Sequence, residues 1–328
     1  MTATQFTEPY RLCAQVSREN GEEPIGSAVT FEQCLLIELP LPWPRDAMQA
    51  PNLPSGVLDV LARAGERGLK IRLQAIIPDA EYSEPGHTRI IHYAQPADFL
   101  TRFRKEEYVL PHEKVKLLIE ALIEQPQLLP AFAAYRRQTE DVREILVCTH
   151  GTRDTCCGTL GVPIYQRLRH NFAPASNGRL RVWRTSHTGG HRFAPTLIDF
   201  PDGHYWGRVE LEMLDVLLHR AGPVSQLREF YRGWSALSHL EQVVEREAWQ
   251  AEGWAWLDYR KTSQLRIIDE ADSRAEVALS FTGPDGQSGS YRAIVEQRGS
   301  VMTLPSSGSG PLREEPLYQV LNLKREQV

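Results

Sequence analysis

The order in which strands and helices follow one another constrains the fold of this 328-residue chain more than any other feature. Each half begins with an apolar strand, continues through a helix into a second strand, and then passes through further strands into another helix. The strands are predicted at residues 34–40, 69–78 and 88–93 of the first half, and at 143–149, 180–186, 194–201 and 204–209 of the second. This alternation is typical of a sheet covered by helices.

The helices are marked by apolar residues at spacings of three and four. The clearest one begins at Pro111, carries its apolar face from Val115 to Ile123, and ends before Pro126. Shorter helices are predicted at 56–68, 162–171 and 211–218. The resulting order, β-α-β followed by β-β-α, is that of the thioredoxin fold. We therefore predict an α/β (α+β) protein with a thioredoxin-like mixed sheet.

The two halves share a short motif, which suggests an internal duplication. The first strand of each half leads into an Arg-Asp pair, in ELPLPWPRD (38–46) and in VCTHGTRD (147–154). The second strand of each half alternates basic and apolar residues, as LKIRL and LRVWR. Because the identity is thin, duplication and two unrelated halves both remain open. If the halves are duplicated, only the second carries the chemistry, since the first lacks cysteine and histidine at the matching places.

Composition and turn signals divide the chain into three predicted parts. Residues 1–140 form an N-terminal α/β domain that opens with a polar, irregular arm of about 30 residues. Residues 141–235 form the thioredoxin-like domain with the candidate site, and residues 236–328 form a helical linker and a small β-rich appendage. The tryptophans of WQAEGWAWLD (249–258) are expected to pack in the core or at a domain interface.

Charge and hydropathy exclude several classes of partner. Lysine and arginine number 37 against 42 acidic residues, so the net charge of -5 gives no broad attraction to nucleic acid or anionic lipid. No apolar run approaches the roughly 18 residues of a membrane span. The first residues, MTATQFTEPYR, lack the charged and apolar regions of a secretory signal, so we expect a soluble cytoplasmic protein.

Two short segments carry the residues best suited to chemistry. Cys148, Cys156 and Cys157 lie within ten residues, and His187 and His191 flank Thr-Gly-Gly in the other segment. Both segments follow strands that are predicted to be neighbours, so we expect them at the same edge of one sheet. The two glycines disfavour a helix and allow a tight loop that aims both imidazoles at one point. This arrangement predicts a metal site.

The ligand chemistry leaves the kind of metal open. Two thiolates and two imidazoles suit a tetrahedral Zn²⁺ site. They also suit a [2Fe–2S] cluster with two cysteines on one iron and two histidines on the other, the Rieske type of ligation. Eight residues separate Cys148 from Cys157, which is longer than the usual zinc spacing of about two to four and favours wrapping a cluster. Spacing alone does not decide between an iron–sulfur cluster, a zinc ion and a metal-free core.

With their surroundings, the two segments resemble the sucrase/ferredoxin-like family. The resemblance rests on C-x₈-C-G with an embedded G-x-R-D, on SHTGGHRFAP (186–195), and on D-F-P-D-G-x-Y-W-G-R (199–208). It covers roughly residues 10–235, including GEEPIGSA and LPLPWPRD of the first half. Members of this family are similar to thioredoxin-like [2Fe–2S] ferredoxins, so the resemblance implies such a cluster with two cysteine and two histidine ligands.

Carried over residue by residue, the resemblance implies that the cluster irons are bound by Cys148, Cys157, His187 and His191. Cys157 is preferred to Cys156 because the family motif places the ligand directly before a glycine, here Gly158. Adjacent cysteines can replace each other, so Cys156 remains an alternative ligand. A cluster with four cysteines, including the distant Cys34 or Cys13, is a further alternative.

Other residues near the motif are expected to support the ligands. Asp154 is predicted to cap the following helix or to pair locally with Arg153. Arg153 and Arg192 could instead offset the negative charge of a cluster and raise its reduction potential. Cys156 is expected to pack behind the ligands, and His150 is expected to hydrogen-bond within its loop.

The implied cluster predicts a one-electron carrier and not an enzyme. Imidazole ligands make such a centre easier to reduce, and Rieske-type potentials lie at roughly −150 to +300 mV against about −400 mV for plant-type ferredoxins. Imidazole nitrogens that reach solvent would couple reduction to proton uptake, so the potential is expected to fall as pH rises. The redox partner is expected to be a separate, unidentified protein, because the chain contains no GxGxxG or Walker motif.

Three other functions compete with an electron carrier. An interaction protein with a structural zinc would be colourless and would unfold on chelation. A thiol-redox enzyme is disfavoured because no C-x-x-C motif is present and adjacent cysteines pair only with strain. Sugar hydrolysis, which the family name suggests, needs two carboxylates across a cleft, and no segment marks such a pair.

Overall fold

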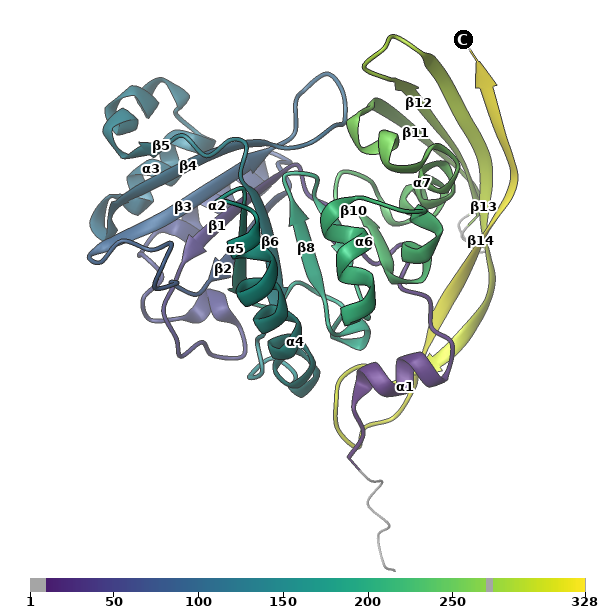
Figure 1. The fold of residues 1–328 in the computed structure, drawn as a ribbon, viewed down its shortest axis with the longest axis horizontal. Helices are drawn as coiled ribbons and strands as arrows, with labels where there is room; N and C mark the ends of the chain where they lie inside the picture. Colours follow the sequence, from purple (N-terminus) through teal and green to yellow (C-terminus); the bar gives the residue numbers. More distant parts are fainter. Residues whose placement is uncertain (1–9, 270–273, 328) are drawn as a thin grey trace, which may run out of the picture.

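The computed structural model describes residues 10–269 and 274–327, which form two β-sheets with helices packed around them (Figure 1). One sheet has ten strands in mixed orientation, and the other has four antiparallel strands. The prediction of an α/β protein with a mixed sheet and a β-rich appendage is therefore confirmed. The first nine residues, which belong to the predicted N-terminal arm, lie outside the described range.

The large sheet has the strand order β10-β9-β8-β6-β7-β2-β1-β3-β4-β5. In chain order its strands are β1 (Gln33–Glu38), β2 (Ile71–Ile76), β3 (His87–Ala94), β4 (Arg104–Pro111), β5 (Arg136–Arg137), β6 (Arg143–Cys148), β7 (Leu180–Thr185), β8 (Leu197–Phe200), β9 (His204–Trp206) and β10 (Tyr231–Trp234). The small sheet consists of β11 (Arg260–Asp269), β12 (Arg274–Thr282), β13 (Ser288–Thr303) and β14 (Arg313–Gln327).

The two halves of the large sheet have the same topology. β6 pairs in parallel with β7 and antiparallel with β8, and β8 pairs antiparallel with β9. β1 pairs in the same way with β2 and β3, and β3 with β4. The halves meet where β2 and β7 run antiparallel, with Ile76 opposite Thr185. Such matching strand orders are what an internal duplication would produce.

The four helices predicted in the two halves are present, although α4 begins at Thr155 and not at residue 162. The α-helices are α1 (Cys13–Glu19), α2 (Val57–Glu66), α3 (Val115–Ile123), α4 (Thr155–Arg167), α5 (Ala173–Ala175), α6 (Leu214–His219) and α7 (His239–Glu252). Short 3₁₀ segments are η1 (Ala47–Gln49), η2 (His112–Lys114), η3 (Pro126–Tyr135), η5 (His191–Phe193), η6 (Leu211–Met213), η7 (Val224–Phe230) and η8 (Gly253–Asp258), and η4 (Leu168–Phe172) is a π-helical turn.

One prediction in the first half of the chain is wrong, and one strand of that half is missed. The N-terminal arm is not irregular throughout, because α1 forms there and buries Cys13, Ala14 and Val16. β4 is not among the predicted strands, because its charged residues hide its buried position. Lys105 of β4 is nearly fully buried and pairs with Glu144 of β6 at 2.6 Å.

The sequence also predicts a helix over 224–234 and two separate strands at 290–299 and 300–308, and both predictions are wrong. Residues 231–234 form strand β10, which extends the large sheet beyond β9. Residues 288–303 form one long strand, β13. The glycine that suggests a turn, Gly299, marks an irregularity in the pairing of β13 with β14, and the strand continues through it.

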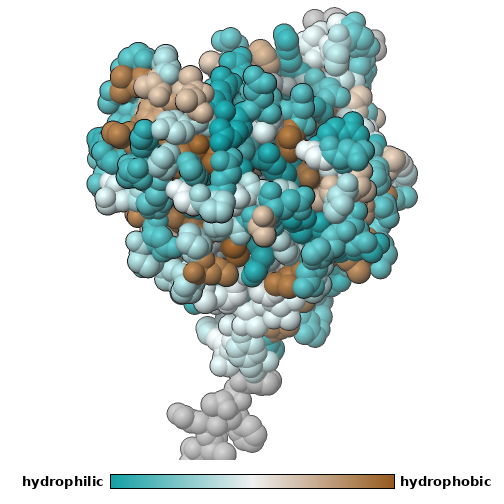
Figure 2. Space-filling view, turned by 60° about the vertical axis from the view of Figure 1, so that its left-hand side comes forward, coloured by the Kyte–Doolittle hydropathy of each residue, from teal (hydrophilic) through white to brown (hydrophobic). Residues whose placement is uncertain are grey.

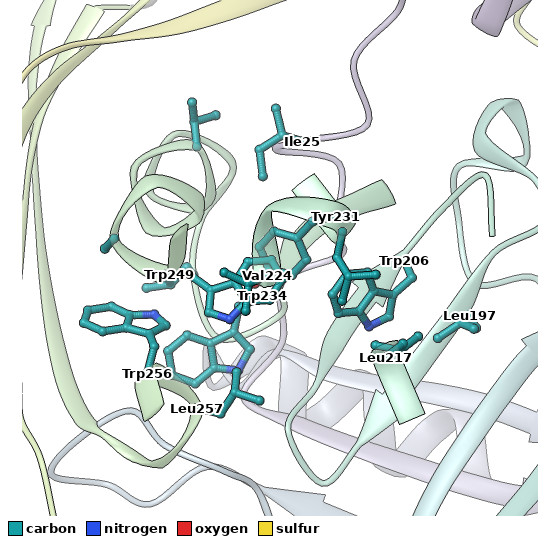
Figure 3. Close-up of a cluster of buried hydrophobic side chains, with 14 of the residues drawn as sticks. Ile25, Leu197, Trp206, Leu217, Val224, Tyr231, Trp234, Trp249, Trp256 and Leu257 are labelled. Atoms are coloured by element: carbon teal, nitrogen blue, oxygen red, sulfur yellow. The ribbon is translucent and has the colours of Figure 1, made fainter. Parts of the chain in front are cut away.

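An aromatic core joins the small sheet to the large one (Figure 3). Trp206 of β9 and Tyr231 of β10 pack against Trp249 of α7, with ring centroids 5.8 and 5.0 Å from it. Trp256 packs against Phe281 of β12, with centroids 5.5 Å apart. Because Trp249 and Trp256 are almost fully buried, the prediction that these tryptophans pack in the core is confirmed for both.

The hairpin of β13 and β14 reaches from the small sheet to the N-terminal helix α1 (Figure 1). Near its tip, Gly308 pairs with Arg11 in an isolated antiparallel bridge. The neighbouring Ser307 donates a hydrogen bond to Asp154, directly before α4. Segments from both ends of the chain therefore meet at the start of α4.

The surface shown in Figure 2 is mainly hydrophilic, with apolar residues scattered over it. Scattered apolar residues are normal on the surface of a folded protein. Within the described residues, no helix has both the length and the apolar character needed to cross a bilayer.

Candidate metal centre

The candidate centre lies at the carboxyl ends of β6 and β7. These strands run parallel, and Cys148 at the end of β6 is opposite Thr185 at the end of β7. The cysteine segment and the histidine segment therefore leave the sheet at the same edge, as their positions in the sequence predict. Cys148 is fully buried because it belongs to a strand with neighbours on both sides.

The turn from β6 into α4 places Cys157 beside Cys148. The Asp154 carboxylate accepts a hydrogen bond from the backbone N–H of Cys156 at 2.9 Å, which confirms the predicted helix cap. The cap puts Cys157 in the first turn of α4. Gly161 then lets α4 lie directly on β6, because a Cβ at this position would be 2.0 Å from the carbonyl oxygen of Cys148.

Two thiols and one imidazole converge at this edge. The sulfur atoms of Cys148 and Cys157 and a ring nitrogen of His187 lie within 4.8 Å of one another. His187 Nδ1 is 4.0 Å from the Cys148 sulfur and 3.7 Å from the Cys157 sulfur. A hydrogen bond from the Cys157 thiol holds the pKa of Cys148 well below its usual range, and the same bond raises the pKa of Cys157. The two cysteine sulfur atoms are thus close enough to share one hydrogen bond.

His191 lies next to this group, and its two ring nitrogens are not equivalent. The ring centroids of His187 and His191 are 5.3 Å apart. Nδ1 of His191 is 3.3 Å from the Asp154 carboxylate and 3.2 Å from the Cys13 sulfur, which leaves Nε2 as the nitrogen available to a metal. Burial lowers the pKa of His191 to about 4, although the nearby Asp154 opposes the shift, so the imidazole is neutral and able to ligate.

The histidine loop depends on its two glycines. Gly189 and Gly190 have φ angles of 86° and 65°, a backbone region that favours glycine. A Cβ on Gly190 would lie 2.4 Å from the guanidinium of Arg232. Arg232 in turn donates a hydrogen bond to the carbonyl oxygen of Gly189 at 3.0 Å. Arg232 therefore holds the histidine loop in place directly before η5 begins at His191.

A layer of buried and partly buried polar side chains lies behind His191. Cys13 of α1 is 3.6 Å from the Cys156 sulfur and 3.6 Å from Asp154 Oδ1. Ser307 of the β13–β14 hairpin donates a hydrogen bond to Asp154 Oδ1 at 2.7 Å and lies 3.2 Å from the Cys156 sulfur. The hydrogen bond from Cys13 lowers the pKa of Cys156 to about 7. Cys156 belongs to this layer and not to the group around Cys148.

Sequence reasoning missed two members of this layer. The sequence suggests Cys13 only as a distant fourth cysteine ligand, and it gives no indication of Ser307. The two residues lie 143 and 151 positions from Cys156 in the sequence. Hydrophobic periodicity and local motifs carry no information about contacts over such separations, so no signal in a single sequence could have found them.

His150 and Arg153 lie in the loop between β6 and α4, and they make different contacts. His150 Nε2 lies 2.9 Å from the carbonyl oxygen of Pro44, and its Nδ1 accepts a hydrogen bond from the backbone N–H of His187 at 3.2 Å. It therefore has the loop-bonding role expected of it. Arg153 forms no ion pair with Asp154 and faces a cavity beside His187.

The remaining candidates lie away from the converging ligands. Arg192 pairs with Glu22 at 2.8 Å and with Glu315 of β14 at 3.2 Å, so its charge is already balanced by protein carboxylates. Cys34 lies in β1, in an apolar cluster with Tyr93 and Trp183. It belongs to neither group of metal-ligating residues that the described part of the chain contains.

Fold and site together define an α/β protein whose large mixed sheet has two halves of the same strand order, with a candidate cysteine–histidine metal centre. The chain belongs to the sucrase/ferredoxin-like family, whose model matches residues 24–233. It is also similar to the altered inheritance of mitochondria protein 32 of Meyerozyma guilliermondii, with 26% identity over 139 residues. That match covers 39% of this chain and 48% of the relative, so it spans about half of that protein. No solved structure matches the chain.

Proposed function

We propose that this protein is a one-electron carrier whose [2Fe–2S] cluster is held by two cysteines and two histidines. The observation that carries the proposal is the convergence of Cys148, Cys157 and His187 within 4.8 Å, with His191 beside them. Two cysteine thiolates and two histidine imidazoles are the donor set of a Rieske-type cluster. The family description, sucrase/ferredoxin-like, agrees with this chemistry.

The residues present fit such a group. When bound, a [2Fe–2S] cluster supplies oxidation and reduction by one electron at a time. Cys148 would ligate as a thiolate, and His187 faces both sulfur atoms with Nδ1. Asp154 favours a proton on Nδ1 of His191, so Nε2 would be the nitrogen that binds the metal. The glycines of both loops let these segments approach each other closely.

The same geometry supports a second candidate function. Three donor atoms within 4.8 Å of one another could surround a single tetrahedral Zn²⁺ ion. The protein would then be an interaction protein with a structural zinc. Chelation would destabilise the second half of the large sheet, because β6, β7 and α4 all meet at the site.

The proposed carrier is not an enzyme itself, and it exchanges electrons with a separate reductase or acceptor protein. We place it in the cytoplasm, without a nucleic-acid or membrane partner. The net charge of -5 supports the exclusion of nucleic acid, since a broad basic surface is what non-specific binding to phosphates requires.

Metal and sulfide analysis tests the proposal. The full chain is purified without oxygen, and its visible spectrum is recorded with iron, zinc and acid-labile sulfide measured on the same sample. We expect a red-brown protein with about two irons and two sulfides per chain. A colourless protein with about one zinc per chain, unchanged after anaerobic reconstitution with iron and sulfide, would overturn the carrier and support the zinc protein.

A further inference from the structure

A cavity of about 350 Å³ opens beside His187 at the edge of the candidate centre. Its lining includes three arginines from three different segments, Arg45, Arg72 and Arg153, together with His150 and His187. His187 is partly exposed, whereas Cys148 and Cys157 are buried. The cavity is therefore a place where a second molecule can come close to a predicted ligand of the centre.

The two halves of the fold build this cavity in a matched way. Arg45 and Arg153 are the arginines of the two Arg-Asp pairs that the sequence repeats. The aspartate after each arginine caps a helix. Asp46 accepts a hydrogen bond from the backbone N–H of Met48 at 3.1 Å, and Asp154 accepts one from that of Cys156 at 2.9 Å. The first-half loop and the cysteine loop are also in direct contact, through the hydrogen bond from Thr152 Oγ1 to the carbonyl oxygen of Trp43 at 3.1 Å.

The third arginine ties the cavity to the histidine loop. Arg72 of β2 donates a hydrogen bond to the carbonyl oxygen of His187 at 3.0 Å and another to the Gln74 side chain at 2.9 Å. Both acceptors are neutral, so the charge of Arg72 is not compensated by these contacts. The guanidinium group is instead held in a fixed position at the edge of the candidate centre.

The charges of this cavity lack the carboxylate partners found elsewhere in the protein. Within the described residues, Arg45, Arg72 and Arg153 form no ion pair, and Asp46 is the one acidic residue in the lining. The larger cavity, of about 830 Å³ at the start of β6, differs in this respect. Most of its basic residues are paired, as in Arg102–Asp202, Arg136–Glu140 and Arg143–Asp199. Unbalanced positive charge thus gathers beside His187.

We infer that this cavity docks carboxylates of an acidic redox partner protein, which then exchanges one electron at the His187 edge of the centre. The inference rests on the proposed function and names the chemistry of its partner. The chain as a whole has a net charge of -5 and offers an acidic protein no broad attraction, so the three arginines of this cavity provide a local one. The charge pattern therefore selects the docking orientation as well as the partner.

Small redox reagents of opposite charge test the docking cavity. The protein is reduced, and its oxidation is followed by stopped flow with ferricyanide, an anion, and with tris(phenanthroline)cobalt(III), a cation. Each oxidant accepts one electron, and no bond is broken. In the double variant Arg45→Gln, Arg153→Gln we expect oxidation by ferricyanide to slow about tenfold or more at low salt. Oxidation by the cobalt complex should not slow.

Controls separate a local effect from a general one. Arg292→Gln removes an exposed arginine of the small sheet, where the partner carboxylate is Glu326, and it should leave both rates unchanged. At about 1 M salt, where charges are screened beyond roughly 3 Å, the double variant should react like the wild type. Iron content and visible spectrum should be equal in all variants.

A competition experiment distinguishes an acidic protein surface from a small anion. Polyglutamate should slow the reaction of the wild type with ferricyanide, and it should have little effect on the double variant. Inorganic phosphate at the same charge concentration should compete much less. Equal competition by phosphate would overturn the partner and make the cavity a small-anion site.

The outcomes keep this inference distinct from the proposed function. A coloured, iron-loaded protein whose rates are unaffected by the double substitution would overturn the docking cavity alone. A chain that takes up no iron would show no reaction with either oxidant. That result would overturn the proposed function, and the docking inference with it.

Discussion

Replacing Gly161 by alanine tests whether the close contact between α4 and β6 shapes the candidate centre. The added Cβ would lie 2.0 Å from the carbonyl oxygen of Cys148, whereas ordinary contacts begin at 3.4 Å. The helix must therefore move away from the strand by about 1.4 Å, the difference between these two distances. Because Cys157 lies on the same helix, its sulfur would move away from that of Cys148.

Two opposing effects decide the stability of the Gly161→Ala variant. Alanine is favoured over glycine in a helix interior by about 1 kcal/mol. Overpacking costs about 1–3 kcal/mol, and a backbone carbonyl cannot rotate away, which places this contact at the upper end of the range. We therefore expect the free energy of unfolding to fall by about 2 kcal/mol in the variant.

Urea denaturation and metal analysis check this expectation on anaerobically purified protein. Gly65→Ala in α2 is the matched control, because a Cβ there meets no atom within 4 Å. The control should be as stable as the wild type or more stable by up to about 1 kcal/mol, with full metal content. If Gly161→Ala matched the control in both stability and metal content, the reasoning from the helix–strand contact would be refuted.

Three further predictions each concern one contact or one buried group. Asp154→Asn should weaken metal binding about 10- to 100-fold in competition with a chelator, because the carboxylate beside Nδ1 of His191 is lost. The control Asp46→Asn changes the equivalent cap of the first half, which has no histidine beside it, and it should leave metal binding unchanged. Cys157→Ser should abolish the visible colour and Cys156→Ser should retain it; the opposite result would exchange the two assignments. Burial lowers the pKa of His204 to about 3. Between about pH 6.5 and pH 3 the unfolded chain therefore binds a proton on this histidine that the folded chain does not. The free energy of unfolding falls by up to about 1.4 kcal/mol per pH unit as the pH is lowered through this range. Urea titrations from pH 7 to 4 should show a shallower loss for His204→Gln, and an unchanged slope would contradict the burial argument.

The meeting of the cysteine and histidine segments is predictable from the sequence. REILVC and LRVWRT are short apolar strands separated by a helix, and such strands pair in parallel as β6 and β7 do. The carboxyl ends of parallel strands share one sheet edge, which brings Cys148 and His187 together. Asp154 is likewise predictable as a cap, because a helix follows it directly.

Other features depend on contacts that no local pattern contains. β4 is missed because Lys105 and Glu107 are charged, although both are buried and pair with Glu144 and Arg181 of the other half. Hydrophobic periodicity cannot detect a strand whose buried residues are ionised. The layer behind His191 is missed for a different reason, since α1 and the β13–β14 hairpin come from opposite ends of the chain.

Pulsed electron paramagnetic resonance of the reduced protein tests the central claim most directly. The claim is that two imidazoles and two thiolates hold a [2Fe–2S] cluster at the edge formed by β6 and β7. In protein labelled with ¹⁵N-histidine, the account predicts an iron–sulfur signal coupled to two directly bound ¹⁵N nuclei, one of which disappears in His187→Cys. An iron–sulfur signal without such couplings would show that the histidines are not ligands and would contradict the account.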